Sequence, residues 1–257
     1  MTAADRSTAP TPRPLAHGRP GDHETTDRVV PGTGAMIWTL CGITLKRLLR
    51  GKALWIGGLF AALPAIYSLV IQVLGAHPAS DQLFVVSTLL LVLLPAIFVG
   101  VTIGEELEDG TSTYLWSRPI ERWAVVAGKL CALTPIVIVL IVAGWSAGTV
   151  IRTGAAPSPA SGIALAAGCV AVSLVAAGIA SIVPRHAMAL TIGYMLTDVF
   201  FSAMPFSLSQ VSIVYHARTL AGLTRDSPAI AAPAIAMAVI AATWTAVGLA
   251  RIRRFEA

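Results

Sequence analysis

The sequence predicts an all-α integral membrane protein with six transmembrane helices. The chain has 257 residues, of which 56% are hydrophobic and only 12% charged, whereas a soluble domain is usually about 25% charged. Apolar runs of about 20 residues recur along it, which is the length that crosses about 30 Å of hydrocarbon as a helix. These runs do not alternate between apolar and polar residues, as the strands of a membrane β-barrel would.

Six such runs are present. A bundle of helices suits them because each helix satisfies its backbone hydrogen bonds internally, as the hydrocarbon requires. The predicted spans are 53–75, 82–103, 128–151, 162–183, 187–206 and 229–250.

Two segments of different character precede the first span. Residues 1–35 are rich in Pro, Thr, Gly and mixed charge, with too little apolar surface to offset the entropy of ordering, so we expect a disordered cytoplasmic tail. Residues 36–51 combine apolar residues at helical spacing with clustered Lys46, Arg47 and Arg50. This pattern predicts an interfacial helix that turns its basic residues toward anionic lipid. A plain cytoplasmic extension of the first span is the alternative.

The basic residues predict the orientation, because Lys and Arg are enriched in cytoplasmic loops. Six spans place both termini on one side. Near the span ends, eleven basic residues lie on that side: Lys46, Arg47, Arg50, Lys52, Arg118, Arg122, Lys129, Arg185, Arg251, Arg253 and Arg254. Three lie opposite: Arg152, Arg218 and Arg225. We expect cytoplasmic termini and, since the alanine-rich spans are typical of a high-GC bacterial gene, a multi-pass protein of the bacterial plasma (inner) membrane.

The connection between the last two predicted spans, residues 207–228, is not simply hydrophilic. Its apolar residues are spaced as in an amphipathic helix. We expect an outer re-entrant hairpin that dips partway into the membrane, provided that protein covers its backbone; an ordinary surface helix is the alternative. His216 in this connection is expected at the surface.

The most polar stretch in the middle of the chain is "EELEDGTSTYLWSRPIERW" at 105–123, between the second and third predicted spans. Its acidic residues crowd at the point where the second span is expected to end. Gly110 supplies a break, a short amphipathic segment follows, and Pro119 ends it. A solvated loop whose acids and bases pair locally is one interpretation.

The side chains of this stretch favour protein docking over catalysis. Tyr114 and Trp116 offer apolar anchors, and Arg118 and Arg122 offer guanidinium forks for carboxylates. Aromatic residues and arginine are the usual energetic centres of protein interfaces.

The longer stretch "GEELEDGTSTYLWSRPIERWAVVAGKL" at 104–130 resembles the segment between the second and third membrane helices of ABC type 2 exporter permeases. In that family, acidic residues, a Gly-Thr pair, a Ser-Arg-Pro-hydrophobic turn, an Arg and a Gly-Lys pair occur in this order. The matching residues are Glu105 or Glu106, Glu108, Gly110, Thr111, Ser117, Arg118, Pro119, Ile120, Arg122, Gly128 and Lys129. The layout of residues 36–254 is also similar to that family.

The resemblance implies a six-span permease domain at 36–257 whose cytoplasmic coupling segment, about 105–123, docks on a separate ATP-binding subunit. It also implies export of a substrate driven by ATP and Mg bound in that partner, and a homodimer or heterodimer of permeases in membrane lipid. The docking residues it implies are Glu105, Glu106, Glu108, Gly110, Thr111, Tyr114, Trp116, Arg118, Pro119 and Arg122.

The chain lacks a nucleotide-binding loop of its own. Such a loop needs Gly-x-x-x-x-Gly-Lys-Ser/Thr to cradle phosphates, and the Gly-Lys pairs at 51–52 and 128–129 lack both the upstream Gly and the following Ser or Thr. We therefore expect no enzyme activity, no cofactor and no metal in this chain. Membrane topology explains its basic charge, so no nucleic-acid partner is expected. The alternative function is a membrane scaffold or sensor that recruits a cytoplasmic partner without transport.

Asp198 is the one acidic residue placed well inside a predicted span. An intramembrane carboxylate is costly and by default a functional hypothesis, here a polar substrate contact or a proton-linked switch. Local hydrogen bonding to Thr197 or Tyr194, or an early end of the span, is the alternative. Two pairs of glycines four residues apart, at 100 and 104 and at 144 and 148, predict close helix contacts, within one chain or between copies.

Overall fold

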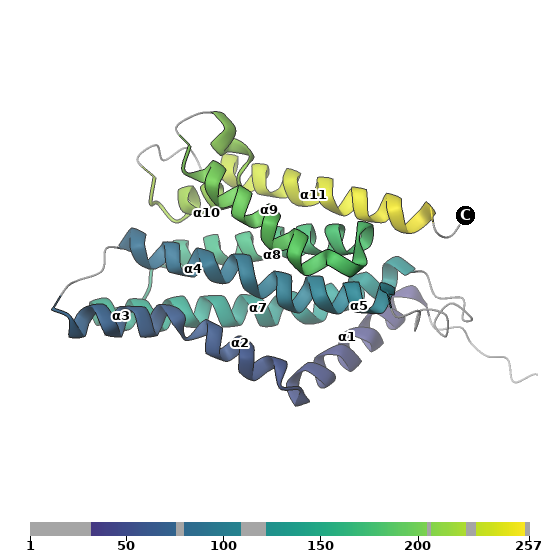
Figure 1. Ribbon diagram of the computed structural model, residues 1–257, viewed down its shortest axis with the longest axis horizontal. Coiled ribbons are helices and arrows are strands. Elements are labelled where there is room, and N and C mark those ends of the chain that lie inside the picture. The colour runs from purple at the N-terminus through teal and green to yellow at the C-terminus, as the bar shows by residue number, and fades with distance from the viewer. Residues whose placement is uncertain (1–31, 76–79, 109–121, 205–206, 225–229, 255–257) are drawn as a thin grey trace, which may run out of the picture. The chain divides into compact units, whose positions relative to one another are not determined.

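The computed structural model describes residues 32–75, 80–108, 122–204, 207–224 and 230–254, and every regular element in these ranges is a helix (Figure 1). The all-α prediction is confirmed for this part of the chain. The elements are α1 (Thr33–Arg50), α2 (Ala53–Ala61), α3 (Leu63–Val73), α4 (Ser80–Pro95), η1 (Ala96–Val101), α5 (Thr102–Glu108), α7 (Arg122–Thr153), α8 (Pro159–Ile182), η2 (Pro184–His186), α9 (Ala187–Ser202), η3 (Ser207–Val211), α10 (Ile213–Leu220) and α11 (Ala231–Arg254).

Five helical stretches of the described ranges are long and apolar enough to cross a membrane: Ala53–Val73, Gln82–Glu108, Arg122–Thr153, Pro159–Ile182 and Ala231–Arg254. They correspond to the first four predicted spans and the sixth, so the prediction of a multi-pass membrane protein is confirmed. The fifth predicted span, 187–206, contains α9, which has 16 residues. Its length of about 24 Å falls short of the hydrocarbon core, so helix length alone does not establish a sixth crossing.

α1 and α2 meet at an elbow (Figure 1). Gly51 has extended backbone, with φ −85° and ψ 158°, and this ends α1 before α2 begins at Ala53. α1 is therefore a separate helix and not a straight continuation of the first span. It begins at Thr33, so the last residues of the predicted disordered tail are helical; residues 1–31 lie outside the described ranges. The position of α1 at the lipid headgroups stays a prediction.

Glycines allow α7 to pack closely against α2 and α3. A Cβ atom on Gly144 would collide with the carbonyl oxygen of Ala61, and one on Gly148 would lie 2.8 Å from that of Pro64. A Cβ atom on Gly104 would likewise lie 2.6 Å from the carbonyl oxygen of Pro184. Both predicted glycine pairs therefore contain residues that make close contacts within one chain.

The second predicted span continues as helix beyond its predicted end. Pro95 lacks the backbone N–H needed for the α-helical ladder, and the chain passes through the π-helical turn η1 before α5 resumes α-helical geometry. The π-helix is rare and occurs mostly as single turns inside α-helices. α5 runs on to Glu108, and Gly104 within it lies against Pro184 without interrupting the helix.

α8 lies at the centre of the packing and runs parallel to α11. Gly178 of α8 lies against Trp244, and Ser181, further along α8, lies against Gly248, further along α11. Because the two helices run in the same direction, the chain must return between the end of α8 and the start of α11. α9 makes this return along the bundle, and η3 and α10 follow at its far end (Figure 1).

The two ends of the bundle carry different elements. We call the end with Glu108, Arg122 and Arg254 the α5 end, and the end with η3 and α10 the α10 end; they lie right and left in Figure 1. The apolar core between them includes the fully buried side chains of Phe84 and Leu94.

Candidate functional site

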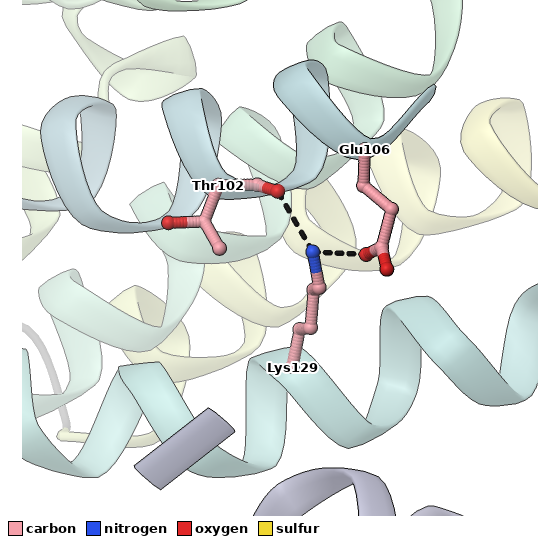
Figure 2. A network of polar contacts seen from close by, with 3 residues as sticks. All are labelled: Thr102, Glu106 and Lys129. Atoms are coloured by element: carbon pink, nitrogen blue, oxygen red, sulfur yellow. Dashed lines mark hydrogen bonds and ion pairs between the residues drawn. The ribbon is translucent and has the colours of Figure 1, made fainter. Parts of the chain in front are cut away.

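An ion pair joins the two helices that flank the predicted coupling segment. Lys129 of α7 pairs with the carboxylate of Glu106 of α5, and its Nζ also donates a hydrogen bond of 2.8 Å to the carbonyl oxygen of Thr102, one turn earlier on α5 (Figure 2). The Lys129 and Glu106 side chains are 13% and 26% exposed. The segment 109–121 therefore starts and ends on helices that are held together at its base.

Close backbone packing positions this ion pair. Gly128, next to Lys129, lies against α1, where an added Cβ atom would be 2.9 Å from Cβ of Leu40 and 3.1 Å from the carbonyl oxygen of Ile37. Gly104, near Glu106, lies against η2. Larger residues at either position would push α5 or α7 away from its neighbour, so the glycines fix the helices from which the two charged side chains extend.

The structure places four of the ten predicted docking residues. Glu105 and Glu108 are exposed on α5, Glu106 is partly buried in the ion pair, and Arg122 begins α7. The other six lie outside the described residues: Gly110, Thr111, Tyr114, Trp116, Arg118 and Pro119. Lys129 was not among the predicted docking residues, although its Gly-Lys pair belongs to the motif that pointed to this region.

Asp198 joins α9 to the start of α10 at the other end of the bundle. The side chain is 4% exposed, and it accepts three hydrogen bonds. The backbone N–H of Ile213 donates to Oδ1 at 2.9 Å, and the backbone N–H of Val214 and the hydroxyl of Ser212 each donate to Oδ2 at 3.0 Å. A carboxylate suits this place because the first N–H groups of a helix lack partners within the helix.

The alternative interpretation of Asp198, a local hydrogen bond to Thr197 or Tyr194, does not describe its carboxylate. Thr197 instead donates its hydroxyl to the carbonyl oxygen of Gly193 in its own helix. The carboxylate is engaged by residues 14 to 16 positions later in the chain. Its described contacts make it a link between two helices.

α10 is packed into the bundle, and His216 is packed with it. The prediction of a surface His216 is wrong: its side chain is 7% exposed, and its Nε2 lies 2.7 Å from the carbonyl oxygen of Gln210. α10 buries its apolar face against α8, where Ala217 lies against Gly168. Gly168 is about 14 Å along the axis from the first residue of α8, so α10 lies beside the bundle and not beyond its end.

Residues 45–204 match the family model described as ABC-2 family transporter protein. This range covers more than half of the chain, from the last part of α1 through α9, and it includes the ion pair and Asp198. No curated protein shows significant similarity to the chain.

Proposed function

Since the chain belongs to the ABC-2 family of transporter proteins and is therefore a permease component of an ABC transporter, we propose that it exports a substrate with energy from a separate ATPase subunit. That partner binds and hydrolyses ATP with Mg, and it docks on the coupling segment 105–123. Two permease chains, identical or different, pair in the membrane to form the complete pathway.

The ion pair between Glu106 and Lys129 is the observation that supports this proposal best. It ties α5 to α7 where both helices lead into the segment 109–121. A partner that pushes on this segment would therefore move the two helices together. α5 continues through η1 into α4, and α7 has 32 residues, so both helices extend such a displacement toward the α10 end.

The direction of the helices supports six crossings with the α5 end in the cytoplasm. The parallel packing of α8 and α11 requires the intervening chain to return across the bundle, and α9 provides that path. α11 ends at the α5 end with Arg251, Arg253 and Arg254, and basic residues favour the cytoplasmic side. Both termini would then be cytoplasmic in the plasma (inner) membrane.

η3 and α10 would form the outer re-entrant element of this transporter. The contact of Ala217 with Gly168 places α10 beside α8, and protein covers its apolar face, as irregular backbone in a membrane requires. The hydrogen bonds from its first turn to Asp198 attach it to α9. In this proposal Asp198 is structural, and transported substrate does not bind its carboxylate.

Co-purification of the partner ATPase tests the docking surface. The tagged full-length chain is extracted in a gentle detergent or nanodiscs, and bound proteins are identified by mass spectrometry in wild type, Trp116→Ala and Arg118→Ala. Trp55→Ala and Arg254→Ala serve as matched controls, because both residues are exposed and lie outside the coupling segment. We expect an ATPase with a phosphate-binding loop in wild type and controls, and its loss in the two variants.

Two results would contradict the proposal. Equal recovery of the ATPase in all variants would place its docking surface elsewhere. Recovery of a partner without any nucleotide-dependent movement of a solute in reconstituted vesicles would favour a membrane scaffold or sensor.

A further inference from the structure

An apolar groove runs over α8 at the α5 end. Its walls are the first turns of α7 and the last turns of α11, and its floor is α8. The groove stays open because α7 and α11 both pack on α8 but contact each other in few places. Its volume is about 160 Å³. A closed apolar cavity of about 150 Å³ holds a molecule of the size of benzene, so this open groove has room for a short part of a hydrocarbon chain.

Small residues create this groove, and its hydroxyl groups are already used. Ala127 of α7 leaves space that a larger side chain would fill, and Gly178 of α8 and Gly248 of α11 let these two helices pack closely along the other side of the groove. Ser181 and Thr245 donate their hydroxyl hydrogens to carbonyl oxygens one turn earlier in their own helices, each at 2.8 Å. The lining therefore suits a hydrocarbon chain and not a polar ligand.

The mouth of the groove suits a negatively charged headgroup. Trp123, in the first turn of α7, lines the groove and is 37% exposed, and tryptophan is enriched at the headgroup level of membranes. Arg253 is exposed and follows the lining residue Leu249 by four positions, which places both on the same side of α11. The first turn of α7 has no acidic residue. Arginine binds phosphate oxygens with two parallel hydrogen bonds.

We propose that this groove binds part of one acyl chain of an anionic phospholipid from the leaflet at the α5 end, with the phosphate at Trp123 and Arg253. Charge decides between a lipid and a second copy of the chain. Two copies related by an axis along the membrane normal bring their α5 ends together, and the basic residues that end α11 would then repel each other. An anionic headgroup neutralises the same charge. The α11 wall lies outside the range that matches the family model.

Native mass spectrometry of the purified full-length chain tests the site, with phosphatidylglycerol and phosphatidylcholine as the two probes. We expect wild type to retain one phosphatidylglycerol per chain in preference to phosphatidylcholine. Ala127→Phe fills the groove and should lose this lipid. Ala143→Phe makes the same change at an exposed position of α7 that does not line the groove, and it should retain the lipid as wild type does.

A matched pair of charge variants tests the headgroup contact. Arg253→Gln should lower the preference for phosphatidylglycerol by roughly fivefold, the effect of one basic residue near an anionic lipid surface. Arg254→Gln removes an equal charge nine positions after Thr245, on the opposite side of α11, and should leave the preference unchanged. If Ala127→Phe does not fold, these two charge variants still test whether the anionic headgroup binds at Arg253, since both arginines are exposed.

Three results would overturn the proposal. The first is equal retention of phosphatidylglycerol by Ala127→Phe and wild type. The second is equal retention of the two lipids by wild type. The third is a change from dimer to monomer in Ala127→Phe without loss of lipid, which would make the groove an interface between copies.

Discussion

The two polar clusters of the molecule hold their helices in different ways. At the α10 end, the short side chain of Asp198 is buried and accepts three hydrogen bonds from residues that begin α10. At the α5 end, the long side chains of Glu106 and Lys129 meet across two helices and remain partly exposed. A short buried carboxylate permits one arrangement, whereas two long, partly exposed side chains can keep their contact in more than one conformation. The contrast predicts that α10 is held in one position at the α10 end, and that the ion pair at the α5 end keeps α5 and α7 together while the two helices move.

Removal of the Asp198 carboxylate should have the largest effect on stability. Asp198→Ala leaves the two buried backbone N–H groups of Ile213 and Val214 without an acceptor, while the Ser212 hydroxyl can still donate to the backbone carbonyl oxygen of residue 198. We expect the free energy of unfolding to fall by about 3 kcal/mol or more, because each buried unsatisfied donor costs about 1–3 kcal/mol. Thermal unfolding in detergent measures this loss, and limited proteolysis should show new cleavage within 207–220.

Thr197→Ala is the control for this variant, because its hydroxyl bonds only within α9 at an exposed position. It should unfold at nearly the wild-type temperature. An Asp198→Ala protein as stable as wild type but inactive in transport would instead make the carboxylate a functional group.

Ser212→Ala should have an intermediate effect. The Ser212 hydroxyl accepts a hydrogen bond from the backbone N–H of Tyr215 at 3.1 Å and donates to Asp198. Loss of such a helix cap costs about 1 kcal/mol. The double variant with Asp198→Ala should lose less than the sum of the single losses, because the two residues share a hydrogen bond. Additive losses in a thermal or denaturant titration would show that the two side chains act independently.

The ion pair at the α5 end should have the smallest effect on stability. Glu106→Ala and Lys129→Ala should each change the free energy of unfolding by about 1 kcal/mol or less, as expected of a partly exposed ion pair. Both should nevertheless lower transport per ATP hydrolysed in vesicles that contain the partner ATPase. The exchange Glu106→Lys with Lys129→Glu restores opposite charges and should recover part of this coupling.

A loss of stability in Glu106→Ala or Lys129→Ala as large as that in Asp198→Ala would contradict this difference between the two ends of the bundle. It would make the ion pair a structural link. Unchanged transport per ATP in all three variants would remove the ion pair from the coupling path.

Local sequence patterns predicted most of the helices but not the contacts between them. A run of about 20 apolar residues satisfies its backbone hydrogen bonds in a bilayer by forming a helix. Five spans therefore lie close to their predicted places. The Asp198 cluster escaped prediction because its partners are 14 to 16 residues away and no local spacing connects them. Hydropathy also could not separate the α-helical and π-helical parts of the second span, since Pro95 and the residues of η1 are as apolar as their neighbours.

The candidate site was predicted only in part, because local patterns reveal charged residues but not which of them form pairs. The acidic residues at 105–108 stood out because they follow an apolar run, and they lie on α5. The ion pair of Glu106 with Lys129 crosses the segment 109–121, so the residues alone did not reveal which of the clustered charges would meet. Burial of His216 was missed because an amphipathic connection does not show which face is covered.

Site-specific photo-crosslinking in the assembled transporter tests directly whether the ATPase subunit docks on the coupling segment. A photoreactive phenylalanine derivative, which keeps an aromatic ring in place of the indole, replaces Trp116 in the coupling segment or, as the control, Leu208, which is exposed at the α10 end. Docking on the coupling segment predicts a crosslink to the ATPase subunit from position 116 and none from position 208. A crosslink from position 208 alone, or from neither position while the ATPase remains bound, would contradict docking on the segment 105–123.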